Sequence, residues 1–201
     1  MTDSARQAAA RLAPPIISLA GMYSDDPGAR AAVGAALRAA CLDKGFLYVV
    51  DHGVPRELTE AVFAQARRFF ALPAPVKMAL ALSPQTHNRG YEPMRGQTLE
   101  AGTPPDLKEG YYIGNDLAAD DPRVLAGLFN HGPNKWPADL PGWREVLTAY
   151  YARMTALCRL TMRALEPSSP NRYASSALAP VPNGRPEPRI WPIRWVCRAT
   201  L

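Results

Sequence analysis

Histidine and cysteine are the side chains in this sequence best suited to metal binding or nucleophilic catalysis, and the chain has three of each. The histidines, His52, His87 and His131, are widely separated along the chain. His52 stands in a tight turn between a strand-like run and a helix-like run. We therefore interpret His52 as a hydrogen-bonded structural residue, with metal ligation as the alternative.

The three cysteines, Cys41, Cys158 and Cys197, show neither a C-x-x-C pair nor a zinc-binding spacing. The first two occupy apolar positions of predicted helices, where a buried free thiol behaves as a small hydrophobic side chain. A disulfide or a catalytic thiol is the alternative interpretation. The sequence therefore offers no cysteine-based metal site.

Three stretches of the chain have the three-to-four residue apolar spacing of amphipathic helices. They run from Pro27 to Gly45, from Pro55 to about Ala71, and from Gly142 to about Leu165. Asp25 and Asp26 can cap the first helix, because their carboxylates accept hydrogen bonds from the free amides of a first turn. The third stretch is the longest helical pattern in the chain.

Shorter elements connect these helices. The segments 15–19 and 46–50 indicate strands, and the second is so continuously apolar that it predicts a strand buried on both faces. Segment 107–114 predicts another strand, 75–82 a short helix, and 84–93 a polar loop. Strands and helices together indicate an α+β protein.

Length and composition favour one globular domain. The 201 residues are 47% hydrophobic and 20% charged, and 21 prolines predict many loops. No apolar run reaches the roughly 18 residues of a membrane span, and the charged amino terminus does not resemble a secretory signal. We therefore expect a cytoplasmic protein without a membrane partner.

The composition changes sharply at Glu166. The segment 166–201 contains seven prolines, and its five arginines and two acids contribute +3 of the net charge of +5. The rest of the chain carries only +2, so no basic face predicts a nucleic-acid partner. We divide the chain into a flexible leader (1–14), a folded domain (15–165) and a tail (166–201) that we expect to be disordered.

The order of several short motifs carries a family resemblance. Over residues 15 to 165 the chain closely resembles the amino-terminal region of the isopenicillin N synthase-like, Fe(II)/2-oxoglutarate-dependent dioxygenases. The matching segments are Pro15 to Leu19, Lys44 to Pro55 (KGFLYVVDHGVP), Phe69 to Pro73 followed by Lys77, Arg89-Gly90-Tyr91, Lys108-Glu109 with Tyr112 to Gly114, and Pro133 to Pro137.

The resemblance implies the helix-rich amino-terminal portion of a double-stranded β-helix, or jelly-roll, dioxygenase with most of the barrel missing. Such an enzyme couples decarboxylation of 2-oxoglutarate and reduction of O2 to oxidation of a small organic substrate. In relatives the loop and strand that carry Arg89, Tyr91, Lys108 and Glu109 lie near the mouth of the barrel. These four residues are therefore candidates for lining the substrate, with a solvated loop and a surface ion pair as the alternative.

The iron site that the family implies needs His-x-Asp or His-x-Glu, a second histidine, and an arginine for the oxo-acid. None of the three histidines here has an acid two positions later. We therefore predict no catalytic residue, no metal ligand set and no tight binding of Fe(II) or 2-oxoglutarate by this chain. The change of composition at Glu166 leads us to hypothesise a frameshifted or truncated gene product.

Two other classes of function stay open. The chain could be a non-catalytic interaction module or pseudoenzyme fragment, which size-exclusion chromatography would separate from an aggregating, broken enzyme. Nucleic-acid binding through the arginines of the tail would require salt-dependent affinity that disappears when residues 166–201 are deleted. The sequence gives neither the substrate nor the oligomeric state.

Overall fold

The computed structural model describes residues 13–98, 100 and 102–165. The tail and nearly all of the leader fall outside this range, so the predicted division of the chain and the interpretation of Cys197 stay predictions. The described chain forms two compact units. Within the described ranges, the first unit comprises residues 13–54 and 153–165, and the second lies between Pro55 and Ala152.

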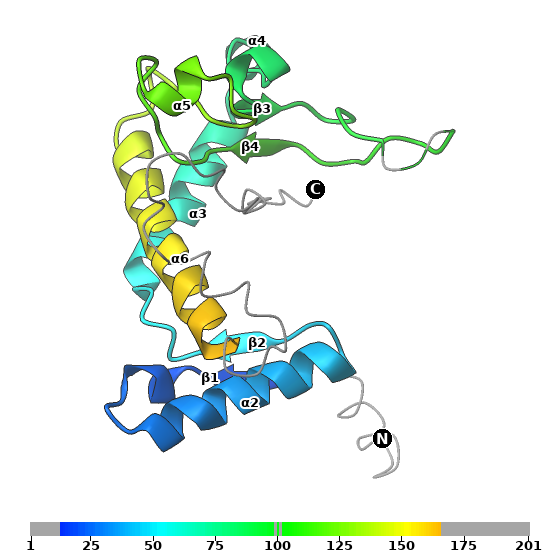
Figure 1. Ribbon diagram of the computed structural model, residues 1–201. Helices are drawn as coiled ribbons and strands as arrows, with labels where there is room; N and C mark the ends of the chain where they lie inside the picture. Colours follow the sequence, from blue (N-terminus) through cyan, green and yellow to red (C-terminus); the bar gives the residue numbers. More distant parts are fainter. Residues whose placement is uncertain (1–12, 99, 101, 166–201) are drawn as a thin grey trace. The chain divides into compact units, whose positions relative to one another are not determined.

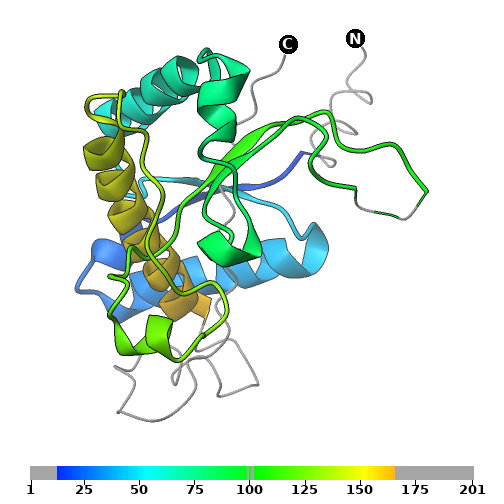
Figure 2. The same cartoon turned by 90° about the horizontal axis from the view of Figure 1, so that it is seen from above.

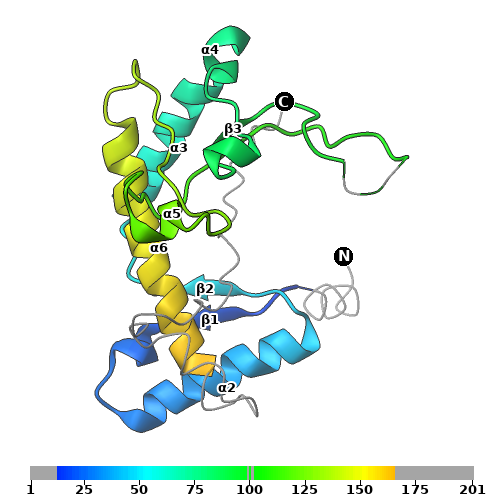
Figure 3. The same ribbon diagram turned by 45° about the horizontal axis from the view of Figure 1, so that its top comes forward.

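A small parallel sheet and one long helix form the framework of the first unit. Its elements are β1 (Ile16–Ser18), η1 (Ala20–Tyr23), α2 (Pro27–Asp43), β2 (Tyr48–Val50) and the carboxyl-terminal part of α6 (Trp143–Leu165). Ile16 pairs with Tyr48, and Ser18 with Val50. Figures 1 and 3 show β1 and β2 side by side along α2. Both strands lie inside the predicted segments.

Helix α2 begins where the sequence predicts. The carboxylate of Asp26 accepts hydrogen bonds from the amides of Gly28 (2.8 Å) and Ala29 (3.2 Å), and Pro27 occupies the first turn. The helix ends at Asp43, and Gly45 follows with a φ of 70°, a left-handed conformation that glycine adopts without strain. The sequence therefore sets both ends of this helix.

Alternate residues of the strands build the core of the first unit, together with one face of α2 and the end of α6. Side chains of successive strand residues point to opposite faces, so Ile17 and Val49 share the inner face. The buried members of this core are Ile17, Leu19, Val33, Leu37, Ala40 and Ala164. The spacing of Val33, Leu37 and Ala40 matches the predicted apolar face of the helix.

Two burial predictions for the first unit are wrong. Strand β2 is not buried on both faces, because Tyr48 and Val50 are exposed and only the opposite face packs on the core. Cys41 is exposed rather than buried, whereas Cys158 is half-buried. Cys41 follows Ala40 directly, and a step of one residue on a helix turns it away from the buried face.

The second unit contains most of the helices and an antiparallel pair of strands. Its elements are α3 (Arg56–Phe70), α4 (Ala74–Met78), η2 (Pro84–Thr86), β3 (Gly90–Glu92), β4 (Gly110–Tyr112), α5 (Pro122–Leu125) and the amino-terminal part of α6. Tyr91 pairs with Tyr111, and Figure 2 shows the two strands side by side. The predicted loop 84–93 is therefore wrong in part, because it contains η2 and strand β3.

Aromatic side chains dominate the core of the second unit. Phe69 is fully buried, with its ring centroid 4.8 Å from that of Tyr111, 4.9 Å from that of Trp143 and 5.9 Å from that of Tyr91. The Phe69–Tyr91 and Phe69–Tyr111 pairs are edge-to-face, an arrangement that stabilises a core by about 0.5–1.5 kcal/mol beyond the burial of its area. This cluster joins α3, both strands and the start of α6.

The described elements are mainly helical, with two separate two-stranded sheets. Helix α6 is the longest of them, at 23 residues. Across the described ranges, no helix combines the length and the hydropathy that a membrane crossing requires.

Candidate functional site

Two charged networks lie on the β3–β4 pair. In the first, the carboxylate of Glu109 accepts hydrogen bonds from the ammonium group of Lys77 at 2.7 Å and from the hydroxyl group of Tyr91 at 2.6 Å. Lys77 also donates to the carbonyl oxygen of Phe70 at 3.1 Å. Burial, together with the hydrogen bond and the charge of Glu109, raises the pKa of Tyr91. Glu109 thus accepts one bond from a cation and one from a neutral donor.

The second network centres on Glu92, the last residue of β3. Its carboxylate accepts a hydrogen bond from the hydroxyl group of Tyr112 at 2.5 Å and lies 3.9 Å from the ammonium group of Lys108. Lys108 also donates to the side-chain oxygen of Gln97 and lies 3.7 Å from a carboxylate oxygen of Asp106. The side chain of Lys108 keeps 19% of its area exposed, so it is held but still accessible to a small molecule.

Arg89 is buried in a separate place. Its guanidinium group donates to the backbone carbonyl of Asn130 at 2.7 Å, and its Nε has no partner within the described part of the chain. Gly114 packs directly against this group, because a Cβ on Gly114 would lie 2.2 Å from the guanidinium. Burial lowers the pKa of Arg89, against the opposing influence of Tyr151 and Asp116.

The four substrate-lining candidates therefore fall into three groups in the second unit. Tyr91 and Glu109 are brought together by a hydrogen bond, Lys108 belongs to the neighbouring network, and Arg89 is packed under Gly114. Whether any of them contacts a substrate stays a prediction. Sequence reasoning did not select Lys77 or Glu92, although both are buried and charged. The sequence shows an acid at the end of a strand and a lysine on a short helix. It does not show how the strands pair, so it could not place these two charges beside their partners.

Each of the three histidines has its own local contacts. The Nδ1 atom of His52 accepts a hydrogen bond from the amide of Val54 at 3.1 Å, so the neutral ring carries its proton on Nε2. This bond agrees with the interpretation of His52 as a hydrogen-bonded structural residue. The ring of His87 packs against Gly132, and Nδ1 of His131 lies 2.9 Å from the carbonyl oxygen of Phe129.

Across residues 13–98, 100 and 102–165, no three His, Cys, Asp or Glu side chains come close enough together to hold one metal ion. A facial triad of two histidines and one carboxylate therefore cannot be assembled from these residues.

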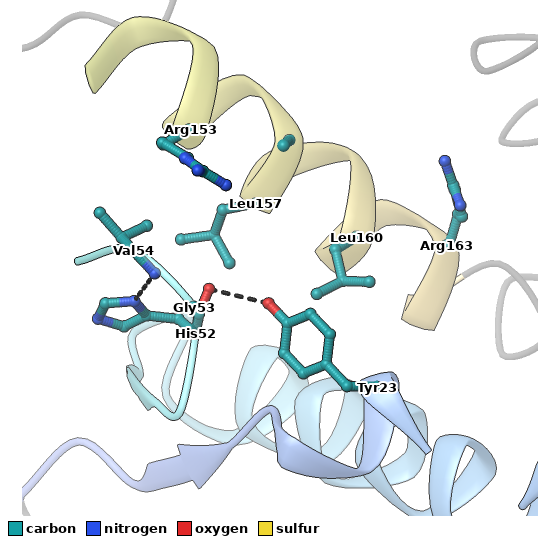
Figure 4. Close-up of a pocket in the computed structure, with 9 residues that line it drawn as sticks. Tyr23, His52, Gly53, Val54, Arg153, Leu157, Leu160 and Arg163 are labelled. Carbon is teal, nitrogen blue, oxygen red and sulfur yellow. Dashed lines mark hydrogen bonds between the residues drawn. The ribbon is translucent and has the colours of Figure 1, made fainter. Parts of the chain in front are cut away.

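A pocket of about 290 Å³ lies in the described part of the first unit. Figure 4 shows Leu157 and Leu160 of α6 pointing towards Tyr23, whose hydroxyl group donates to the carbonyl oxygen of His52 at 2.9 Å. Arg153 and Arg163 lie at the rim, and no carboxylate lines the pocket. The pocket is open to solvent, and its lining combines leucine side chains with His52, Tyr23 and the two arginines.

Comparison with known proteins supplies the family. Residues 14–139 match the family described as the amino-terminal region of the non-haem dioxygenase in morphine synthesis. The chain belongs to this family. The resemblance that the motifs predicted is therefore confirmed for the amino-terminal region of an Fe(II)/2-oxoglutarate dioxygenase.

The similar proteins are named as oxidoreductases or dioxygenases that use 2-oxoglutarate. The 2-oxoglutarate-Fe(II) type oxidoreductase hxnY of Emericella nidulans is 43% identical over 150 residues, which cover 73% of this chain and 43% of that protein. The 2-oxoglutarate-dependent dioxygenase citB of Monascus ruber is 42% identical over 142 residues, which cover 68% of this chain and 42% of that protein. The chain thus spans less than half the length of these relatives.

Solved structures agree on the fold. A full-length Neurospora crassa protein crystallised in complex with alpha-KG superposes with a TM-score of 0.61 at 26% identity and covers 75% of this chain and 45% of its own. JOX2 in complex with 2OG, Fe and JA gives a TM-score of 0.55 at 29% identity, covering 76% of this chain and 39% of its own. The predicted fold class, a helix-rich α+β portion of a jelly-roll dioxygenase, is confirmed.

The cofactors of the family do not fit the residues that the structure describes. Fe(II) and 2-oxoglutarate are the cofactors of the relatives by their names. The described residues of this chain contain no three-ligand cluster for the metal. Their most buried guanidinium group, that of Arg89, is packed against Gly114 rather than open to an oxo-acid.

Proposed function

We propose that this chain is the amino-terminal portion of an oxidoreductase that couples oxidative decarboxylation of 2-oxoglutarate to oxidation of a small organic substrate. The family match over residues 14–139 supports the assignment. We further propose that the chain alone neither binds iron tightly nor turns over, because its described residues offer no group of ligands. This part of the proposal rests on one observation, that the described residues bring no three metal-binding side chains together.

The test measures iron stoichiometry and succinate formation. The purified chain is incubated anaerobically with Fe(II) and 2-oxoglutarate, desalted, and analysed for bound metal and for succinate after O2 is admitted. The hxnY relative, treated in the same way, controls for loss of iron during handling. We expect bound iron well below one per chain and no succinate above the protein-free blank. One iron per chain would contradict the proposal.

We also propose that the β3–β4 segment faces the substrate, with Lys108 as the residue that contacts it. Lys108 combines a positive charge with an accessible side chain, whereas Arg89 and Tyr91 are each only 4% exposed. In this proposal the hydrogen bond between Tyr91 and Glu109 links β3 to the segment that carries Lys108 and so helps to position Lys108.

The assay for Lys108 uses the chain co-expressed with the part of hxnY outside the matched 150 residues, in a preparation that forms succinate. In such a preparation, supplied with the substrate of hxnY, Lys108→Met should raise the KM for that substrate by about tenfold with kcat nearly unchanged, as expected for loss of uniform binding. An unchanged KM would remove Lys108 from the substrate site.

An exposed apolar surface favours a second candidate function, a non-catalytic interaction module. Ile16 and Tyr48, paired across the parallel strands, are 69% and 63% exposed. Size-exclusion chromatography with light scattering separates the possibilities. A discrete, reproducible complex would support a module, whereas soluble aggregate of mixed size would support a fragment of an enzyme.

A further inference from the structure

Two walls enclose the pocket of the first unit. Tyr23 and the turn 52–54 form one wall, and helix α6 forms the other. The residues that α6 contributes follow the three-to-four residue spacing of one helix face. They are Arg153, Ala156, Leu157, Leu160 and Arg163. All of the lining residues belong to the first unit, whereas the four substrate-lining candidates belong to the second.

The wall opposite α6 is held in place by the chain itself. The hydroxyl group of Tyr23 donates to the carbonyl oxygen of His52 at 2.9 Å, and the amide of Val54 donates to Nδ1 of His52 at 3.1 Å. Gly53 has a φ of 71°, and a Cβ there would lie 2.9 Å from the hydroxyl oxygen of Tyr23. Glycine at this position therefore lets the ring lie close to the turn. A wall fixed in this way need not be ordered by a ligand.

The lining combines positive charge with an apolar surface. Arg153 and Arg163 are its charged side chains apart from the histidine, and no carboxylate lines the pocket. Figure 4 shows Leu157 and Leu160 extending from α6 towards Tyr23, with Arg153 on the side of Val54. In the same view Arg163 extends away from Tyr23. Arg153 is therefore the cation nearest to a ligand that rests on the two leucines.

These features select one class of ligand. A guanidinium group pairs with a carboxylate through two parallel hydrogen bonds, so Arg153 suits an organic acid. The leucines and the tyrosine ring favour an apolar body, because burial of apolar area stabilises binding. The volume of about 290 Å³ lies at the lower end of the range for ligand pockets, about 300–1,000 Å³, so the body is small.

We propose that this pocket binds a small carboxylic acid with an apolar body about the size of one aromatic ring. The carboxylate pairs with Arg153, and the body packs on Leu157 and Leu160 opposite Tyr23. This binding site lies in the first unit and needs no iron, so it does not rest on the proposed oxidoreductase function.

The experiment titrates the full, isotope-labelled 201-residue chain with phenylacetate and follows its amide NMR signals. We expect saturable shifts of the Gly53 and Val54 amides, with a dissociation constant on the order of 1 mM or below. Phenylacetamide has the same shape without the charge and should bind at least about tenfold more weakly, since it loses the ion pair. Inorganic phosphate has the charge without the apolar body and should also bind at least about tenfold more weakly.

Point variants locate the ligand. Arg153→Met should weaken phenylacetate binding at least about tenfold, because it removes the cation and keeps the length of the side chain. Arg159→Met is the matched control, since Arg159 is an exposed arginine of the same helix that does not line the pocket. It should change the dissociation constant by less than about twofold.

A second variant tests the cavity rather than the charge. Ala156→Phe places a ring inside the pocket from an exposed position of α6 and should abolish the saturable shifts. Circular dichroism checks that the helices persist in each variant. The proposal is overturned if phenylacetate gives no saturable shift up to about 10 mM, or if the shifts are confined to other segments. Equal binding of phenylacetamide or phosphate, or equal effects of Arg153→Met and Arg159→Met, also overturns it.

Discussion

Replacing Lys77 by methionine should destabilise the second unit strongly. The ammonium group of Lys77 lies 2.7 Å from the carboxylate of Glu109, and the two side chains are only 10% and 12% exposed. At this distance and an effective dielectric constant of about 20, their direct attraction is about 6 kcal/mol. Desolvation of both ions offsets much of that attraction, but loss of one partner leaves a buried, unpaired charge.

The expected loss for Lys77→Met is therefore about 3–5 kcal/mol in the free energy of unfolding. With a urea dependence of about 2 kcal/mol per molar, the unfolding midpoint should fall by about 1.5–2.5 M. Tryptophan fluorescence, to which Trp143 (2% exposed) contributes, follows the unfolding. The double variant Lys77→Met with Glu109→Leu should recover part of the loss, because it removes both charges.

The chain contains a matched control for burial. Arg56 and Glu60 also form an ion pair at 2.7 Å, but their side chains are 86% and 61% exposed. Arg56→Met should change the free energy of unfolding by less than about 0.5 kcal/mol, since water screens an exposed pair. If Lys77→Met and Arg56→Met have the same effect, the argument from burial is refuted.

Four further outcomes are expected. Asp26→Ala removes the cap of α2 and should lower the free energy of unfolding by about 1 kcal/mol in urea denaturation. Gly114→Ala, whose Cβ would meet a buried guanidinium at 2.2 Å, should lower it by about 1–3 kcal/mol in the same assay. Burial raises the pKa of Tyr111 above 10.0. The neutral side chain therefore adds stability below pH 10, and this stability is lost as the pH rises towards the raised pKa. Tyr111→Phe should make the thermal midpoint depend less on pH in this alkaline range. Maleimide labelling followed by mass spectrometry should modify exposed Cys41 at least about tenfold faster than Cys158, whose pKa is raised by burial.

The long helices could be predicted from the sequence because their signals are local. The cap at Asp26, the glycine at Gly45 and the apolar spacing between them are all visible within twenty or so residues. Strand β3 could not be predicted in the same way. It spans only Gly90–Glu92, and its register with Tyr111 comes from a segment far along the chain.

The hydrogen-bond and ion-pair partners of the candidate site residues could not be predicted from neighbouring positions in the sequence either. Lys77 and Glu109 are 32 positions apart, so their ion pair follows from the packing of α4 on the strands and from no short motif. The exposure of Tyr48 was mispredicted for a related reason. An apolar run shows that a strand can be covered on both faces, but not which polypeptide does the covering.

Helix α6 imposes an order on the assembly of the chain during synthesis. Trp143, at its start, completes the aromatic core of the second unit, and Ala164, near its end, belongs to the core of the first unit together with Ile17. Ile17 leaves the ribosome long before Ala164 is made. Amino-terminal parts of a chain usually fold first during synthesis, but the first unit cannot complete its core in that order. The core of the first unit can therefore be completed only after the whole of the second unit has been translated.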